Sequence, residues 1–201
     1  RGAIGVIDTG IDTSSPALAT ARIDTRTFFE GPAPAASHGT DVASVLAHPD
    51  RLRNPRILGA NVFSGRDAQG LLAGAAALVR ALDWLAEEDV QFVNLALAGP
   101  YNKLLDLAVE RASARGLILV AAVGNAGPRS DALYPAGFDG VIAVTAVDAE
   151  TRIYRNAVRG AHVDVAAPGV DVLVRSDQGA RFVTGTSIAT PFVTARLAAD
   201  P

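Results

Sequence analysis

The sequence predicts a doubly wound α/β domain with a mainly parallel sheet and helices on both faces. Short aliphatic runs alternate with longer segments of helical periodicity, which is the pattern of βαβ units. The aliphatic runs are almost continuously apolar, as strands of a parallel sheet are when both faces are buried. The chain has 201 residues, of which 49% are hydrophobic and 19% charged. That length and composition suffice for one domain with a sizeable core.

Six segments are predicted to be strands, because each is short and rich in valine, isoleucine, leucine or alanine. They are Ala3–Ile7, Ile57–Phe63, Phe92–Leu97, Leu117–Val123, Val141–Val147 and Val163–Ala166.

Four segments between or after these strands are predicted to be helices. Ala73–Glu88 and Leu104–Arg115 carry apolar residues on one face, and Asn102 stands where the second of them needs an N-cap. Gly39–Ala47 and Ser187–Ala199 are apolar on nearly every face. We therefore expect the last two helices to be buried.

Composition excludes several classes of function. The net charge of −3 lacks the basic excess that nucleic-acid binding needs, so no nucleic-acid partner is expected. The absence of cysteine excludes disulfides, thiolate metal sites and a cysteine nucleophile. Arg80 and Asp83 interrupt the longest aliphatic region, so no membrane span is expected. No cofactor and no metal site is predicted, and His48–Arg56 lacks the oxygen ligands that calcium requires.

Three polar residues lie where an α/β sheet binds its ligands, beyond the carboxyl ends of the strands. Asp8 follows the first predicted strand, Asn125 follows the fourth, and His38 precedes a helix. Ser187 begins the last helix, where unpaired N–H groups and the helix dipole favour a developing negative charge. Ser187, His38 and Asp8 can therefore act as nucleophile, base and orienting carboxylate.

Four motifs contain these residues in one chain order. Val-Ile-Asp-Thr-Gly-Ile-Asp contains Asp8, and His-Gly-Thr begins at His38. Ala-Ala-Val-Gly-Asn-Ala-Gly contains Asn125, and Gly-Thr-Ser-Ile-Ala-Thr-Pro contains Ser187. In these motifs and their order, the sequence resembles the subtilisin-like serine proteases (subtilases, peptidase family S8). The resemblance implies that residues 1–201 form a subtilase catalytic domain, the core of a longer precursor.

The resemblance also implies an activity. A subtilase is a serine endopeptidase that hydrolyses peptide bonds through an acyl-enzyme. Ser187 would attack the peptide carbonyl, His38 would accept its proton, and Asp8 would orient the imidazole. Asn125 and the backbone N–H of Ser187 would form the oxyanion hole.

The resemblance further implies a substrate-binding segment and a neighbouring pair of residues. These are Ala96, Leu97, Ala98 and Gly99, with Val123 and Gly124. Subtilases usually read Ser-Leu-Gly-Gly in this segment, so Ala98 adds a Cβ beside the primary specificity pocket. Ala126 supplies no charge at its base. We therefore expect a small or apolar P1 residue, the residue before the scissile bond.

Two further positions have sequence-based interpretations. Asp41 stands where subtilases commonly carry a second histidine, and we interpret it as a favourable charge in the first turn of a helix. Pro191 is expected in the first turn of the last helix, where its missing N–H costs little.

Partners and localisation follow from the resemblance alone. It implies a polypeptide substrate, an N-terminal prosegment, a monomeric state, and a secreted or periplasmic location. The start of the chain inside a predicted strand is compatible with removal of a prosegment.

Other interpretations remain open at this stage. The fold could be retained as a catalytically silent binding module, since a fold alone does not prove activity. The chain could also need another segment to complete its cleft. Asp-Thr-Gly is also typical of aspartic proteases, but those are all-β and bring two copies together, whereas this chain has one. Retention of Asp8, His38, Asn125 and Ser187 favours the protease.

Overall fold

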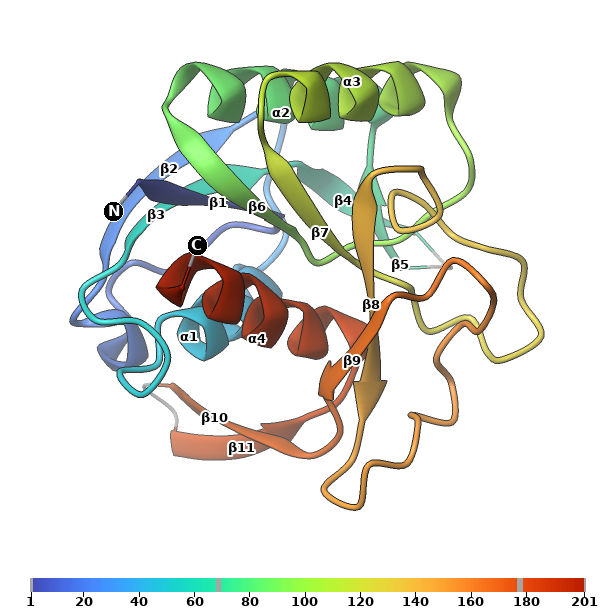
Figure 1. Ribbon diagram of the computed structural model, residues 1–201. Helices are drawn as coiled ribbons and strands as arrows, with labels where there is room; N and C mark the ends of the chain where they lie inside the picture. Colours follow the sequence, from blue (N-terminus) through green and yellow to red (C-terminus); the bar gives the residue numbers. More distant parts are fainter. Residues whose placement is uncertain (1, 68–69, 177–178, 201) are drawn as a thin grey trace.

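The centre of the molecule is a seven-stranded sheet in which every pair of neighbouring strands is parallel (Figure 1). The computed structural model describes residues 2–67, 70–176 and 179–200. In spatial order the strands are β2 (Arg22–Thr27), β3 (Arg56–Asn61), β1 (Ala3–Asp8), β6 (Val90–Leu95), β7 (Ile118–Ala122), β8 (Val141–Val147) and β9 (Val165–Pro168).

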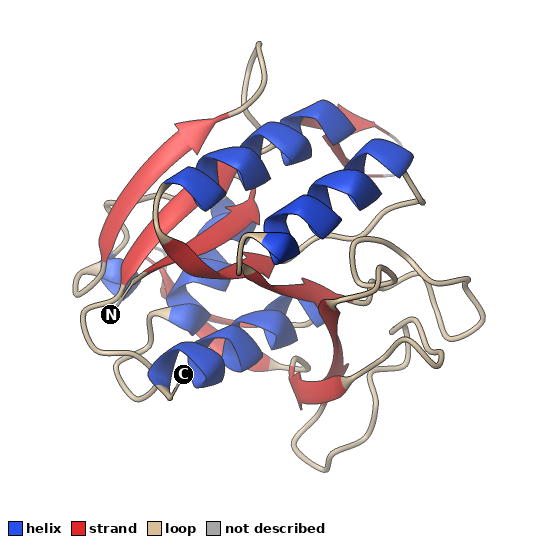
Figure 2. Ribbon diagram, turned by 45° about the horizontal axis from the view of Figure 1, so that its top comes forward, coloured by secondary structure: helices blue, strands red, loops and turns tan. Residues whose placement is uncertain are grey.

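Helices cover both faces of this sheet, which confirms the predicted fold class (Figures 1 and 2). One face carries α2 (Ala75–Glu87) and α3 (Lys103–Ala114), and the other carries α1 (Ser37–Leu46) and α4 (Thr186–Ala199). Outside the sheet lie a short 3-10 helix, η1 (Pro16–Leu18), and two antiparallel hairpins. The hairpins are β4 (Phe63–Asp67) with β5 (Gly70–Ala73), and β10 (Val172–Ser176) with β11 (Gly179–Val183).

All six predicted strands and all four predicted helices are present; Val141–Val147 has the predicted bounds, and the boundaries of the others are shifted. The predicted strand Phe92–Leu97 ends at Leu95, so Ala96 and Leu97 lie beyond the sheet. Asn102 is the N-cap of α3, and its side chain accepts hydrogen bonds from two backbone N–H groups. Within the described residues, no helix has the length and apolar character that crossing a membrane would require.

Two sequence-based placements within helices were wrong. Because α1 begins at Ser37, Asp41 is its fifth residue and lies in the second turn. Pro191 is likewise the sixth residue of α4 and lies inside that helix. Pro191 therefore has no N–H to donate to the carbonyl of Ser187, four residues earlier. The two first-turn interpretations, a favourable helix dipole at Asp41 and a missing N–H of little cost at Pro191, therefore do not apply.

A buried hydrogen bond connects α4 to the centre of the sheet. The hydroxyl of Thr194 donates to Oδ1 of Asn94 on β6 over 2.9 Å, and both residues are fully buried. The amide nitrogen of Asn94 has no hydrogen-bond partner among the described residues. Thr194 is therefore the side-chain partner that offsets the cost of burying this amide.

We predict that Thr194→Val lowers the free energy of unfolding by about 1–3 kcal/mol, because it leaves the buried amide of Asn94 without that partner. Urea denaturation measures the change. The control is Thr25→Val on the exposed edge strand β2, where the same chemical change should cost no more than about 0.5 kcal/mol. Equal losses in the two variants would contradict the role assigned to the bond.

Candidate active site

Asp8 lies at the carboxyl end of β1, in the middle of the sheet, and is fully buried. Its Oδ1 accepts a hydrogen bond of 2.6 Å from the backbone N–H of Thr9. The same oxygen lies 2.7 Å from Nδ1 of His38. The strand end and its following turn therefore fix the carboxylate and direct it at the imidazole.

His38 is held against Asp8 because α1 packs directly on the turn after β1. A Cβ on Gly39 would lie 2.6 Å from the carbonyl oxygens of both Thr9 and Gly10, which is closer than real contacts allow. The N–H of Gly39 donates to the hydroxyl of Thr9 over 2.8 Å. Glycine is therefore required after His38 by the closeness of the two backbones.

Ser187 approaches His38 from the other side. It is the second residue of α4, and its Oγ lies 2.9 Å from Nε2 of His38. The serine is 9% exposed. The structure thus brings Asp8, His38 and Ser187 into one continuous hydrogen-bonded series, although the chain separates His38 from Ser187 by 149 positions.

The surroundings of His38 favour its protonated form. Burial alone lowers the pKa of His38, but the charge of Asp8, the hydrogen bond to Asp8 and the charge of Asp41 raise it by more. The net result is a pKa above the ordinary value. The imidazole is therefore a stronger base than a free histidine, and it becomes protonated as the pH falls through this raised value.

Asn125 is held beside Ser187 by the residue that precedes the serine. The N–H and the hydroxyl of Thr186 both donate to Oδ1 of Asn125, over 3.0 and 3.1 Å. The Thr186 hydroxyl also accepts from the N–H of Gly124 over 3.1 Å. With its oxygen held in this way, the Asn125 amide keeps its NH₂ group as a donor.

Gly185 leaves open the space between this amide and the serine. A Cβ on Gly185 would lie 3.3 Å from Oγ of Ser187 and 3.5 Å from Nδ2 of Asn125. The two groups therefore border the same small region of space. A negatively charged oxygen formed next to Ser187 would have this amide donor close by.

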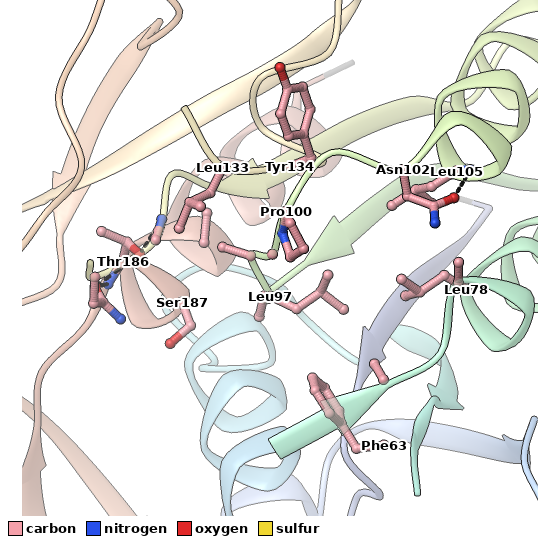
Figure 3. A pocket seen from close by; sticks show the side chains of 18 of the residues that line it. Phe63, Leu78, Leu97, Pro100, Asn102, Leu105, Leu133, Tyr134, Thr186 and Ser187 are labelled. Carbon is pink, nitrogen blue, oxygen red and sulfur yellow. Dashed lines mark hydrogen bonds between the residues drawn. The ribbon is translucent and has the colours of Figure 1, made fainter. Parts of the chain in front are cut away.

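A cleft of about 420 Å³ opens beside these residues (Figure 3). In Figure 3, Thr186 and Ser187 lie at one end of the cleft and Leu78 and Leu105 at the other, and His38 also belongs to the lining. Among the described residues of the lining, only His38 and Tyr134 have ionisable side chains. The cleft therefore offers apolar side chains together with uncharged polar groups, and no carboxylate lies among the described lining residues.

Five of the six predicted substrate-binding residues line this cleft, namely Ala96, Leu97, Ala98, Gly99 and Gly124. Val123 does not, because it is fully buried in the core. The Cβ of Ala98 lies 3.0 Å from the place that a Cβ on Gly124 would occupy, so these two segments face each other closely.

Leu133 and Tyr134 also line the cleft, and no sequence pattern predicts their place there. The backbone of Tyr134 exchanges two hydrogen bonds of 2.8 Å with that of Gly99, and Leu133 lies next to Gly124. Both residues come from a loop without helical or strand periodicity, so no pattern predicts where their side chains lie. The Tyr-Pro-Ala sequence at 134–136 is the one local signal.

Within residues 2–67, 70–176 and 179–200, no three histidine, aspartate or glutamate side chains form a group that could hold a metal ion. The remaining two histidines lie outside the site. His48 is exposed next to Asp50 and His162 lies in a loop.

Comparison with sequence families and relatives gives a consistent result. The model of the Subtilase family, Peptidase S8, matches residues 2–199. Subtilisin DY of Bacillus licheniformis is 32% identical over 201 residues, which cover 94% of this chain and 73% of that protein. A thermophilic serine proteinase of Bacillus sp. (strain AK1) is 36% identical over 204 residues, covering 94% of this chain and 49% of that protein. The chain thus spans only about half the length of the second relative.

Solved structures share the same fold. A cold adapted subtilisin-like serine proteinase superposes with a TM-score of 0.81 at 26% identity, covering 98% of this chain and 73% of that one. The prenylagaramide maturation protease PagA gives a TM-score of 0.80 at 24% identity, covering 96% and 72%. The likeness to PagA is one of fold alone.

We predict that Gly39→Ala separates α1 from the turn after β1. The added Cβ has no space, so the free energy of unfolding should fall by about 1–3 kcal/mol. A displacement of His38 by an ångström should slow any reaction at Ser187 by up to about 100-fold. Urea denaturation and the rate of labelling by a fluorophosphonate measure the two effects.

The matched control is Gly74→Ala, because Gly74 has ordinary backbone angles and its Cβ would meet open space. Gly74→Ala should change the free energy of unfolding and the rate of labelling much less than Gly39→Ala does. If the two alanine variants behave alike, the close approach at Gly39 does not position the histidine.

Proposed function

The chain belongs to the subtilase family of serine endopeptidases, and we propose that it hydrolyses peptide bonds through an acyl-enzyme formed on Ser187. The observation that carries this proposal is the hydrogen-bonded series from Asp8 through His38 to Ser187 at the end of a cleft. The nucleophile, its base and the group that orients the base are all within hydrogen-bond distance.

In the proposed first step, Oγ of Ser187 attacks the carbonyl carbon of the scissile peptide bond while Nε2 of His38 accepts the hydroxyl proton. The C–N bond then breaks, and His38 returns that proton to the leaving amine. Water attacks the acyl-enzyme in the same way and releases the acid. Asp8 keeps the Nδ1 proton in place and stabilises the imidazolium.

We further propose that Asn125 and the backbone N–H of Ser187 stabilise the tetrahedral oxyanion. Support comes from the double anchoring of the Asn125 oxygen by Thr186, which leaves the NH₂ group as the donor. It also comes from the position of Ser187 at a helix N-terminus, where backbone N–H groups have no partner within the helix.

The cleft supports a preference for a small or apolar P1 residue. Ala98 and Gly124 face each other closely, and Leu133 lies next to Gly124. No carboxylate is present among the described lining residues to pair with a lysine or arginine of the substrate. A charged P1 side chain would lose its hydration without gaining a partner.

Family membership supports three further proposals. We propose that the chain is made with an N-terminal prosegment, acts as a monomer and is secreted or periplasmic. Mass spectrometry of the ends of the natural product would test the first, and sedimentation would test the second. No observation on the described residues favours a catalytically silent binding module.

We predict that Ser187→Ala abolishes labelling of the purified chain by a fluorophosphonate, because that reagent needs an activated serine oxygen. Ser130→Ala removes a serine hydroxyl in a loop, which donates to the backbone carbonyl of Asp131, and this variant should label as the unaltered chain does. Intact-mass measurement detects the adduct. Labelling that survives in Ser187→Ala would refute the assignment of the nucleophile.

We predict that a peptide library is cleaved mainly after small or apolar residues such as alanine and leucine. Sequencing of the products by mass spectrometry gives the P1 distribution. The substitution Ala98→Glu should raise the share of cleavage after lysine and arginine, because it supplies the missing carboxylate. A library cleaved mainly after lysine or arginine by the unaltered chain would rule out the proposed preference.

A further inference from the structure

The proposed mechanism does not use Asp41, a second carboxylate close to His38. Asp41 lies three residues after His38 on α1, so the two side chains are neighbours on one face of the helix. The Asp41 side chain is only 10% exposed. A carboxylate in such a place is costly unless a positive group pairs with it.

That positive group comes from the β10–β11 hairpin. Nη2 of Arg181 on β11 donates to Oδ2 of Asp41 over 2.5 Å. Burial raises the pKa of Asp41, and the hydrogen bond and charge of Arg181 oppose that rise. The arginine side chain is 48% exposed, so it reaches from solvent into the protein at this point.

The register of the hairpin explains why Arg181 faces α1. Arg181 pairs with Val174 across the two strands, so both side chains lie on the same face of the hairpin. Val174 is buried in the cluster that contains Val42 and Leu46 of α1. The next pair, Leu173 with Phe182, lies on the opposite face and is exposed.

The ion pair connects two of the segments that carry the proposed active site. β11 ends at Val183, and the chain then passes through Thr184 and Gly185 to Ser187. Asp41 lies one turn beyond His38. The pair therefore joins the strand that leads to the serine to the helix that carries the histidine, and Figure 1 shows this hairpin beside α1 and α4.

We propose that Asp41 and Arg181 are positioning residues for His38, in which Asp41 adds a second negative charge beside the imidazole and Arg181 holds that carboxylate in place. This inference rests on the proposed function. A charge that only stabilised the end of the helix would not act on the imidazole. The proposed role of Asp41 is instead to act on His38, three residues earlier in the chain.

The charged groups around His38 are few. Oδ1 of Asp8 on β1 lies 2.7 Å from Nδ1 of His38, and Asp41 lies about one turn from His38 on the same helix. Of the other elements packed on α1, β10 carries Arg175, which is exposed, and α4 carries Arg196 near its far end. Arg196 pairs with Asp200 there. The effect of Asp41 on His38 can therefore be separated from that of other charges by substitution.

The test is a pH titration of the His38 ring signals by NMR, which does not depend on catalysis. The chain has three histidines, so His48 and His162 serve as internal references. In Asp41→Asn, the His38 midpoint should move to lower pH, because a negative charge is lost and Arg181 is left unpaired. In the double variant Asp41→Asn/Arg181→Gln, the midpoint should move back toward that of the unaltered chain.

The matched control is Asp41→Asn/Arg175→Gln. Arg175 lies on the same hairpin, and no ion pair is found for it in the described part of the chain. Its loss should therefore leave the His38 midpoint at the value measured for Asp41→Asn alone. If Asp41→Asn does not fold, Asp41→Ser replaces it throughout the series.

The proposal is overturned by a midpoint that stays in place or rises in the single variant, or by two double variants that behave alike. A merely structural role would lower stability without moving the midpoint. The pH dependence of fluorophosphonate labelling separates this inference from the proposed function. If His38 titrates as predicted while no variant or unaltered chain is labelled, the inference holds and the proposed function fails.

Discussion

The candidate site depends on one contact, in which the first turn of α1 lies against the turn that follows β1 with no room for a side chain between them. Gly39 meets the carbonyl oxygens of Thr9 and Gly10, and this closeness brings the imidazole of His38 within 2.7 Å of Asp8. A parallel sheet with buried strands supplies the rigid support, since Asp8 ends a strand with neighbours on both sides. The geometry of the base is therefore set by backbone packing, before any substrate binds.

The serine is brought to the same place by a second layer of constraints. Helices α1 and α4 pack side by side on one face of the sheet, so a histidine and a serine near their N-termini can meet. Thr186 then connects the serine turn to the loop of Gly124 and Asn125 by three hydrogen bonds. The result is a preorganised arrangement in which the proposed nucleophile, its proposed base and an amide donor are all held by elements of the scaffold.

Much of this arrangement could be predicted from sequence, because each predicted residue follows a strong local pattern. Asp8, Asn125 and Ser187 stand next to apolar runs whose period predicts a strand or a helix. The order of the four motifs then groups these residues with His38 in one site. The edge strand β2 could not be predicted, because its alternation of arginine, aspartate and threonine lacks the apolar character of buried strands. The pair of Asp41 and Arg181 could not be predicted either, because the two residues are 140 positions apart and meet through a hairpin register that the sequence leaves open.

The most direct test of the central claim, that the scaffold holds a serine, a base and an amide donor ready for acyl transfer, is a crystal structure of the chain with a peptide boronic acid. We predict a covalent bond from Oγ of Ser187 to boron, with one boronate oxygen within hydrogen-bond distance of Nδ2 of Asn125. The peptide should lie along Ala96–Gly99. A boronate bound without a bond to Ser187, or with no oxygen directed at Asn125, would contradict the account.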